Sequence, residues 1–99
     1  MSPSKVDRDR LNRLEDLPNI GPAMAGDLRR IGVATPDDLA GRDPVELYEH
    51  LCQAAGTRQD PCVLDVFMSV VSFMDGGPAL PWWAFTERRK RLVGGRNGA

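Results

Sequence analysis

The fold of this chain is decided by the stretch Leu17-Pro18-Asn19-Ile20-Gly21-Pro22-Ala23-Met24-Ala25. It leads from a leucine-spaced segment into a run that begins at Pro22, a residue type favoured in the first turn of a helix. Asn19 tolerates a positive φ better than other non-glycine residues do. The stretch therefore predicts a tight turn that opens directly into a helix. The first backbone N–H groups of such a helix have no intrahelical partner, so they can bind a phosphate without any lysine.

Apolar spacing and capping residues predict the other helices. Leu11, Leu14 and Leu17 mark the inward side of a first helix over residues 7–16. The helix that follows the turn ends at Gly32. Capping residues followed by prolines, and the apolar spacing after them, predict further helices over about residues 36–40, 44–55, 61–74 and 82–92. No segment alternates like a strand, so we expect an all-α fold, a compact orthogonal bundle of five or six short helices containing a helix-hairpin-helix motif.

The expected helix over residues 61–74 is the most apolar. Its polar positions, Asp65, Ser69 and Ser72, fall in one narrow stripe. A helix that is apolar nearly all round belongs in the middle of a bundle.

Length and composition indicate one small domain. We expect it to cover residues 7–93 of the 99, between a disordered N-terminus at 1–6 and a disordered tail at 94–99. Hydrophobic and charged contents of 41% and 27% are typical of soluble proteins. There is no apolar run of about 20 residues and no apolar stretch typical of a secretory signal, so we expect a cytoplasmic protein that does not bind membranes.

Charge is unevenly distributed along the chain. The net charge is −1, which excludes a generically basic nucleic-acid binder. Residues 1–13 hold four basic and two acidic residues, and residues 86–99 hold five basic and one acidic. Residues 37–65 hold seven acidic residues against two arginines. A polyanion should therefore meet the ends and the hairpin, not the acidic middle.

The hairpin supplies the candidate nucleic-acid-binding residues. Backbone N–H groups would contact phosphates, and two arginines further along the helix would add charge. The set comprises Asn19, Ile20, Gly21, Ala23, Met24, Arg29 and Arg30. The same pattern also fits a corner that packs two helices together or contacts a protein. The sequence leaves both interpretations open.

A basic run near the C-terminus, Arg88-Arg89-Lys90-Arg91, follows the aromatic residues of the segment Pro81-Trp82-Trp83-Ala84-Phe85. Aromatics beside cations can stack on bases. The pattern fits equally a closing helix with a solvated basic face, on which Trp83 is partly exposed.

No catalytic or metal site is predicted. His50 and Cys52 lie two positions apart on an expected helix, so their side chains diverge, and with Cys62 they supply fewer than the roughly four ligands of zinc. We expect buried thiols and a surface histidine. Cys62, near a helix start, leaves a redox role as a lesser alternative. With a single histidine and no phosphate-binding loop motif, we expect neither an enzyme nor a cofactor.

Three segments resemble one family. They are the hairpin stretch, the run Gly56-Thr57-Arg58-Gln59-Asp60-Pro61-Cys62-Val63-Leu64-Asp65, and Pro81-Trp82-Trp83. Over roughly residues 10–91 the chain is similar to the small bacterial "pathogenicity locus" proteins, often labelled helix-hairpin-helix domain proteins or mitomycin resistance proteins. The resemblance implies a bacterial origin and a link to DNA. It implies no activity, substrate or catalytic residue.

The expected function is that of a non-enzymatic helix-hairpin-helix module. It would contact the DNA backbone weakly and without sequence preference, in association with DNA repair. The alternative is a protein–protein interaction adaptor of the same fold, which would use the acidic middle of the chain or an exposed Trp83.

Overall fold

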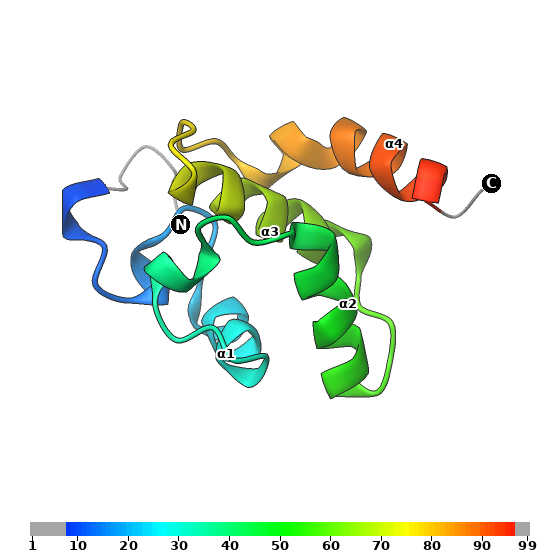
Figure 1. Ribbon diagram of the computed structural model, residues 1–99, viewed down its shortest axis with the longest axis horizontal. Helices are drawn as coiled ribbons and strands as arrows, with labels where there is room; N and C mark the ends of the chain where they lie inside the picture. The colour runs from blue at the N-terminus through cyan, green and yellow to red at the C-terminus, as the bar shows by residue number, and fades with distance from the viewer. Residues whose placement is uncertain (1–7, 97–99) are drawn as a thin grey trace.

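The computed structural model describes residues 8–96, with side chains as far as Leu92, and every regular element in this range is helical. Four α-helices and four short 3₁₀ turns make up this range (Figure 1). The α-helices are α1 (Pro22–Arg30), α2 (Pro44–Ala55), α3 (Pro61–Met74) and α4 (Thr86–Arg96). The turns are η2 (Arg8–Arg10), η3 (Leu14–Asp16), η4 (Pro36–Leu39) and η5 (Trp82–Phe85). The all-α prediction is confirmed, but the α-helices of the described range number four rather than five or six.

Helix α3 forms the centre of the molecule. It contacts α2, α4, η4 and η5, and in Figure 1 α2 descends steeply from it while α4 runs above it. Nine of its 14 residues are buried, so it has almost no solvent face. The prediction that this helix is the most buried is confirmed. Helix α1 packs beside α2 and η3.

Other elements of the fold form hydrogen bonds with the polar stripe of α3. Asp65 is fully buried and accepts hydrogen bonds from Nε of Arg89 at 2.8 Å and from the hydroxyl of Thr86 at 2.7 Å. Ser69 is also buried, and its hydroxyl oxygen accepts a hydrogen bond from the Asn19 side chain at 3.0 Å. Buried polar groups must be paired to avoid a large desolvation penalty. These bonds therefore fix α4 and the hairpin turn on α3.

The predicted first helix over residues 7–16 is wrong for the residues described. The chain forms two separate 3₁₀ turns there, and Arg13 between them is extended. The Asp16 carboxylate accepts hydrogen bonds from the backbone N–H groups of Asn12 and Arg13, both at 2.9 Å. A short acidic side chain that binds nearby amides competes with helix formation. Leu14 is still fully buried, so the leucine spacing reports burial rather than a continuous helix.

The predicted starts of α1, η4, α2 and α3 are confirmed, whereas the last helix, predicted from about residue 82, begins as the 3₁₀ turn η5 and becomes α-helical only at Thr86. Asp43 and Asp60 cap α2 and α3, and a capping box from Thr35 to Asp38 opens η4, which is a 3₁₀ turn. Helix α4 continues to Arg96, past the expected end and into the segment expected to be a tail. Residues 97–99 and the expected disordered N-terminus at 1–6 lie outside the described residues.

Part of the basic N-terminal segment is used inside the fold. The guanidinium of Arg8 donates to the carbonyl oxygens of Phe73 at 2.6 Å and Gly77 at 2.5 Å, and lies 3.9 Å from the centre of the Phe73 ring. A cation here binds carbonyl oxygens at and just beyond the C-terminus of α3, where the negative end of the helix dipole favours it. Within residues 8–96, no helix is long and apolar enough to cross a bilayer.

Candidate nucleic-acid interface

The hairpin turn is built around Asn19. Its φ is 66°, the left-handed conformation predicted for this position. Its side-chain amide donates to the hydroxyl of Ser69 at 3.0 Å and to the carbonyl of Leu80 at 2.8 Å. A glycine would adopt the same φ but could not make these bonds. Asn19 therefore turns the chain and ties the turn to α3 and the segment after it. The Ile20 side chain is fully buried beside it.

The first turn of α1 has unpaired amides. No acceptor among residues 8–96 receives a hydrogen bond from the N–H of Asn19, Gly21, Ala23 or Met24. Ile20, in contrast, closes a hydrogen-bonded turn over residues 17–20 and is fully buried. The first amide of this turn to be paired is that of Ala25, which donates to Gly21 at 3.0 Å. Four of the five predicted backbone donors thus carry no bond to another described residue, whereas Ile20 and the side chain of Asn19 are held inside the fold.

Helices α2 and α3 begin differently from α1. The Asp43 carboxylate accepts from the Val45 amide at 2.9 Å, and the Asp60 carboxylate accepts from the Cys62 amide at 3.0 Å. Each carboxylate satisfies one amide and places a negative charge at the positive end of the helix dipole. Gly21 offers no side chain to its helix. The start of α1 therefore keeps its capacity to attract an anion.

The space beside Gly21 is open. Its φ of −96° and ψ of −177° are extended values that any residue adopts, and an added Cβ would meet nothing within 4 Å. Neither the backbone conformation nor the packing of residues 8–96 requires a glycine here. A small side chain can therefore be added at this position without a clash.

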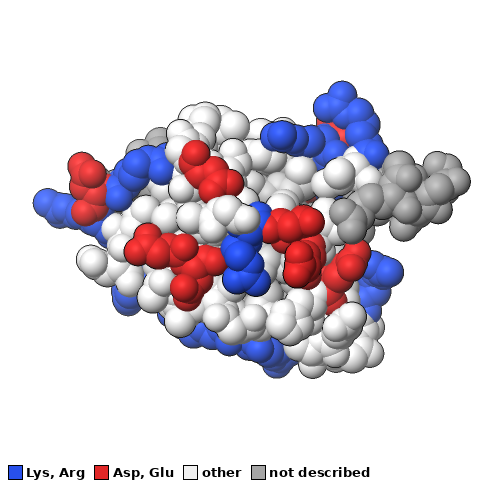
Figure 2. All heavy atoms as spheres, in the orientation of Figure 1, with Lys and Arg blue, Asp and Glu red and all other residues white. Residues whose placement is uncertain are grey.

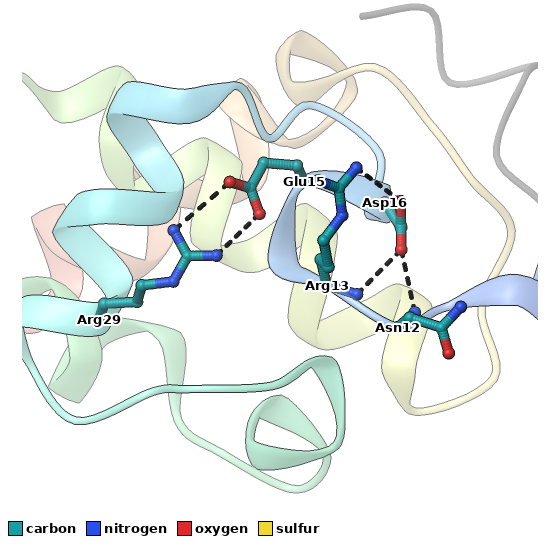
Figure 3. Close-up of polar contacts among 5 residues, drawn as sticks. All are labelled: Asn12, Arg13, Glu15, Asp16 and Arg29. Atoms are coloured by element: carbon teal, nitrogen blue, oxygen red, sulfur yellow. Dashed lines mark hydrogen bonds and ion pairs between the residues drawn. The ribbon is translucent and has the colours of Figure 1, made fainter.

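The two candidate arginines of α1 differ. The Arg29 guanidinium binds both carboxylate oxygens of Glu15, at 2.8 and 3.4 Å, and Figure 3 shows it pointing across to η3. This hydrogen bond is the main cause of the lowered pKa of the Glu15 carboxyl. Arg29, which was predicted to add charge to the hairpin, is thus engaged by a carboxylate of the fold. Arg30 is exposed and contacts no acidic side chain of the described range.

The ion pair between Glu15 and Arg29 was not predicted from the sequence. The two residues are 14 positions apart and lie on different elements, so no helical spacing relates them. Figure 3 also shows Arg13 directed toward Asp16, 3.9 Å away, in the same charged cluster. This cluster ties η3 to α1 at the place where the first helix was expected.

The charge distribution inferred from the sequence is visible on the surface. On the face drawn in Figure 2, acidic side chains gather across the middle, and most basic side chains lie toward the edges. The residues of the C-terminal basic run have two roles. Arg89 is directed into the protein toward Asp65, whereas Arg88, Lys90 and Arg91 are exposed.

The aromatic segment before the basic run is partly exposed to solvent. Trp83 is 62% exposed, which confirms the expected exposure, and its ring meets the Trp82 ring edge-on with 5.6 Å between centroids. Phe85 is buried. The carbonyl of Leu80 that receives the Asn19 side chain belongs to the same segment, so the exposed indole follows closely after a residue that touches the hairpin turn.

The thiols and the histidine show no sign of a reactive site. Burial is the main cause that raises the pKa of the Cys62 thiol, and Asp60 raises it further. A thiol with a raised pKa holds less of the nucleophilic thiolate. The Cys52 sulfur accepts a hydrogen bond from the Gln59 amide at 3.3 Å, and both cysteines are half-buried. His50 is exposed, and no cluster of three metal-ligating residues occurs in the described part of the chain.

Comparison with known proteins identifies the family. The family model described as "Pathogenicity locus" (Cdd1) matches residues 7–91. The chain is 49% identical over 82 residues to "Mitomycin resistance protein McrB" of Streptomyces lavendulae, and the match covers 83% of this chain and 78% of that protein. No solved structure matches significantly. The extent of these matches shows that the chain belongs to the pathogenicity locus family.

Proposed function

We propose that this protein contacts the DNA backbone through the start of α1, weakly and without sequence preference, as a non-enzymatic module of the bacterial cytoplasm. One observation carries the proposal. Helices α2 and α3 start with an aspartate that occupies a first-turn amide, whereas α1 starts at Gly21 with its amides unpaired among the described residues. The positive end of a helix dipole with unpaired amides favours a phosphate.

The hairpin would act as a reduced helix-hairpin-helix motif. Turn η3 stands where the first helix of such a motif would lie, and Asn19 supplies the left-handed turn. Phosphate oxygens would meet the amides of Gly21, Ala23 and Met24, and exposed Arg30 would add a charge. Arg29 is excluded from this set because it is paired with Glu15. Backbone amides bind phosphates without reading bases, so the contact has no sequence preference.

A salt-dependent titration tests the proposal. Fluorescence anisotropy of a labelled 30-base-pair duplex of random sequence is measured at 50 and 200 mM salt with up to tens of micromolar protein. Binding should appear at 50 mM salt and weaken steeply as salt rises, by about 0.9 in log–log slope for each phosphate neutralised. Arg30→Glu should weaken binding. The matched control, Arg58→Glu in the loop after α2, should leave it nearly unchanged. Absence of binding at 50 mM salt, or equal effects of both variants, would refute the assignment.

A protein-interaction role is the second candidate, favoured by Trp83. A large aromatic side chain that is 62% exposed is typical of interface anchors. If this role is the true one, a stoichiometric protein partner will be recovered with the wild-type chain and lost with Trp83→Ser. DNA binding will then be absent from the titration above.

A further inference from the structure

A second surface lies away from the hairpin, in a groove where α3, α4 and the start of α2 meet. Its volume is about 720 Å³. Apolar side chains form the floor, among them Val71, Phe85 and Leu92. Three arginines, Arg42, Arg88 and Arg91, lie along its sides. The groove thus combines an apolar base with cationic walls.

The arginines of α4 are placed there by the buried pair described above. Arg89 is fixed on Asp65 at 2.8 Å, which sets the rotation of α4 about its axis. At about 100° per residue, Arg88 and Arg91 then fall on one side of the helix and Lys90 on another. Both arginines line the groove, and Lys90 does not.

Two of the three arginines of the groove lack acidic partners within residues 8–96, whereas Arg42 lies near Asp38 and helps to lower the pKa of its carboxyl. No carboxylate of these residues forms an ion pair with Arg88 or Arg91, and Arg42 has one long contact of 3.5 Å to the Asp38 carbonyl. The acidic residue of the groove, Asp75, has one oxygen bound to the Gly41 amide at 2.8 Å. The walls of the groove therefore carry three cations against one engaged carboxylate, which favours an anionic occupant.

We propose that this groove binds an acidic amphipathic helix of a partner protein. Arg88 and Arg91 are separated by one helical turn, which matches carboxylates at positions i and i+3 or i+4 of a partner helix. The apolar residues of that helix would pack mainly against Leu92, since Val71 and Phe85 are only 5% exposed. Amphipathic helices fill grooves in this mode. Leu92 is 38% exposed, so apolar surface is available for this contact.

The groove and the hairpin lie on different sides of α3. Ser69 receives the hairpin, whereas Met68, Val71 and Asp75 line the groove roughly a third of a turn away. The proposed helix site is therefore independent of phosphate binding at Gly21, and each can fail without the other.

The test uses a synthetic 16-residue helix labelled with fluorescein, with leucines along one face and glutamates flanking them, titrated with the full chain and followed by anisotropy. We expect binding that Arg88→Glu combined with Arg91→Glu weakens about tenfold or more, whereas Lys90→Glu, the same charge change on the same helix, alters it less than about threefold. Leu92→Ser, at a partly exposed position, should also weaken it. Gly21→Asp should leave it unchanged.

Four results would overturn the proposal. The first is no binding of the acidic helix. The second is equal loss with Lys90→Glu, which would show general attraction to a basic surface. The third is equal binding of a comparator helix with lysine at every glutamate position. The fourth is loss of duplex DNA binding, rather than of helix binding, in the variant with both arginines reversed, which would assign the groove to nucleic acid.

Discussion

Replacing Gly21 by aspartate should separate the stability of the fold from its proposed function. The variant places a carboxylate at the start of α1, as Asp43 and Asp60 already do for α2 and α3. The backbone at Gly21 accepts any residue, and the new Cβ meets nothing within 4 Å. The change therefore adds a capping group without a steric cost.

Its effect on stability follows from the capping geometry. The new carboxylate can accept from the Ala23 amide, the equivalent of the bond that Asp43 receives from Val45 at 2.9 Å. The cap and the helix dipole together should stabilise the folded state by about 0.5–1 kcal/mol. For a domain of this size, the melting temperature should rise by roughly 2–8 °C.

Its effect on DNA binding has the opposite sign. The carboxylate occupies an amide that the phosphate needs and repels the phosphate that remains. A hydrogen bond to a charged group contributes about 1.5–3 kcal/mol, so the loss of one should weaken binding roughly tenfold to hundredfold. Circular dichroism melting and the duplex titration at 50 mM salt measure the two effects on the same sample.

The matched control is Gly26→Asp. Gly26 is exposed on α1, and a Cβ there also meets nothing within 4 Å. This variant adds the same charge beyond the first turn, so it should change DNA binding less than about threefold. A Gly21→Asp protein that melts higher and still binds DNA like the wild type would refute the phosphate assignment. A lower melting temperature would refute the capping geometry itself.

Three further predictions concern the fold. Asp65→Ala leaves the partly buried Arg89 guanidinium without its carboxylate and opens a cavity, so it should cost about 2–3 kcal/mol, measured by urea unfolding. Asn19→Gly keeps the positive φ but loses both side-chain bonds, so it should destabilise by about 1–3 kcal/mol, and Asn19→Ala should cost more because it also strains the backbone. Backbone hydrogen bonds lower the pKa of the Asp16 and Asp38 carboxyls below 3.8. Their stabilisation of the fold is therefore present above that pH and is lost as the pH falls through the folded-state pKa values. In Asp38→Asn, the free energy of unfolding should fall less steeply as the solution is acidified.

Local rules predicted much of the fold correctly. The starts at Thr35, Asp43 and Asp60 follow from capping chemistry within a few residues, and the structure has all three. The left-handed turn at Asn19 follows from the residue type. The prediction of the first helix was wrong for a reason that is also local. The Asp16 carboxylate accepts hydrogen bonds from the amides of residues 12 and 13, and the apolar spacing gives no sign of this competition.

The candidate site was predicted only in part, because side-chain partners come from distant positions. The unpaired amides of Gly21 and its neighbours follow from a proline-started helix without a capping side chain. That Arg29 is engaged by Glu15 while Arg30 is not depends on how η3 packs against α1, and no spacing in the sequence relates the two residues.

The sequence by itself determined where α1, α2 and α3 begin, which apolar faces are buried and where the charges lie, because these depend on neighbours a few positions apart. The tertiary structure decided which polar groups remain available. Burial of Asp65 demanded a partner, and Arg89 was close enough in space to supply it. The Ser69 hydroxyl is paired with the Val66 carbonyl of its own helix and also accepts from Asn19. Desolvation is costly for any unpaired group, so the packing of α3 fixed which cations point inward and which remain at the surface.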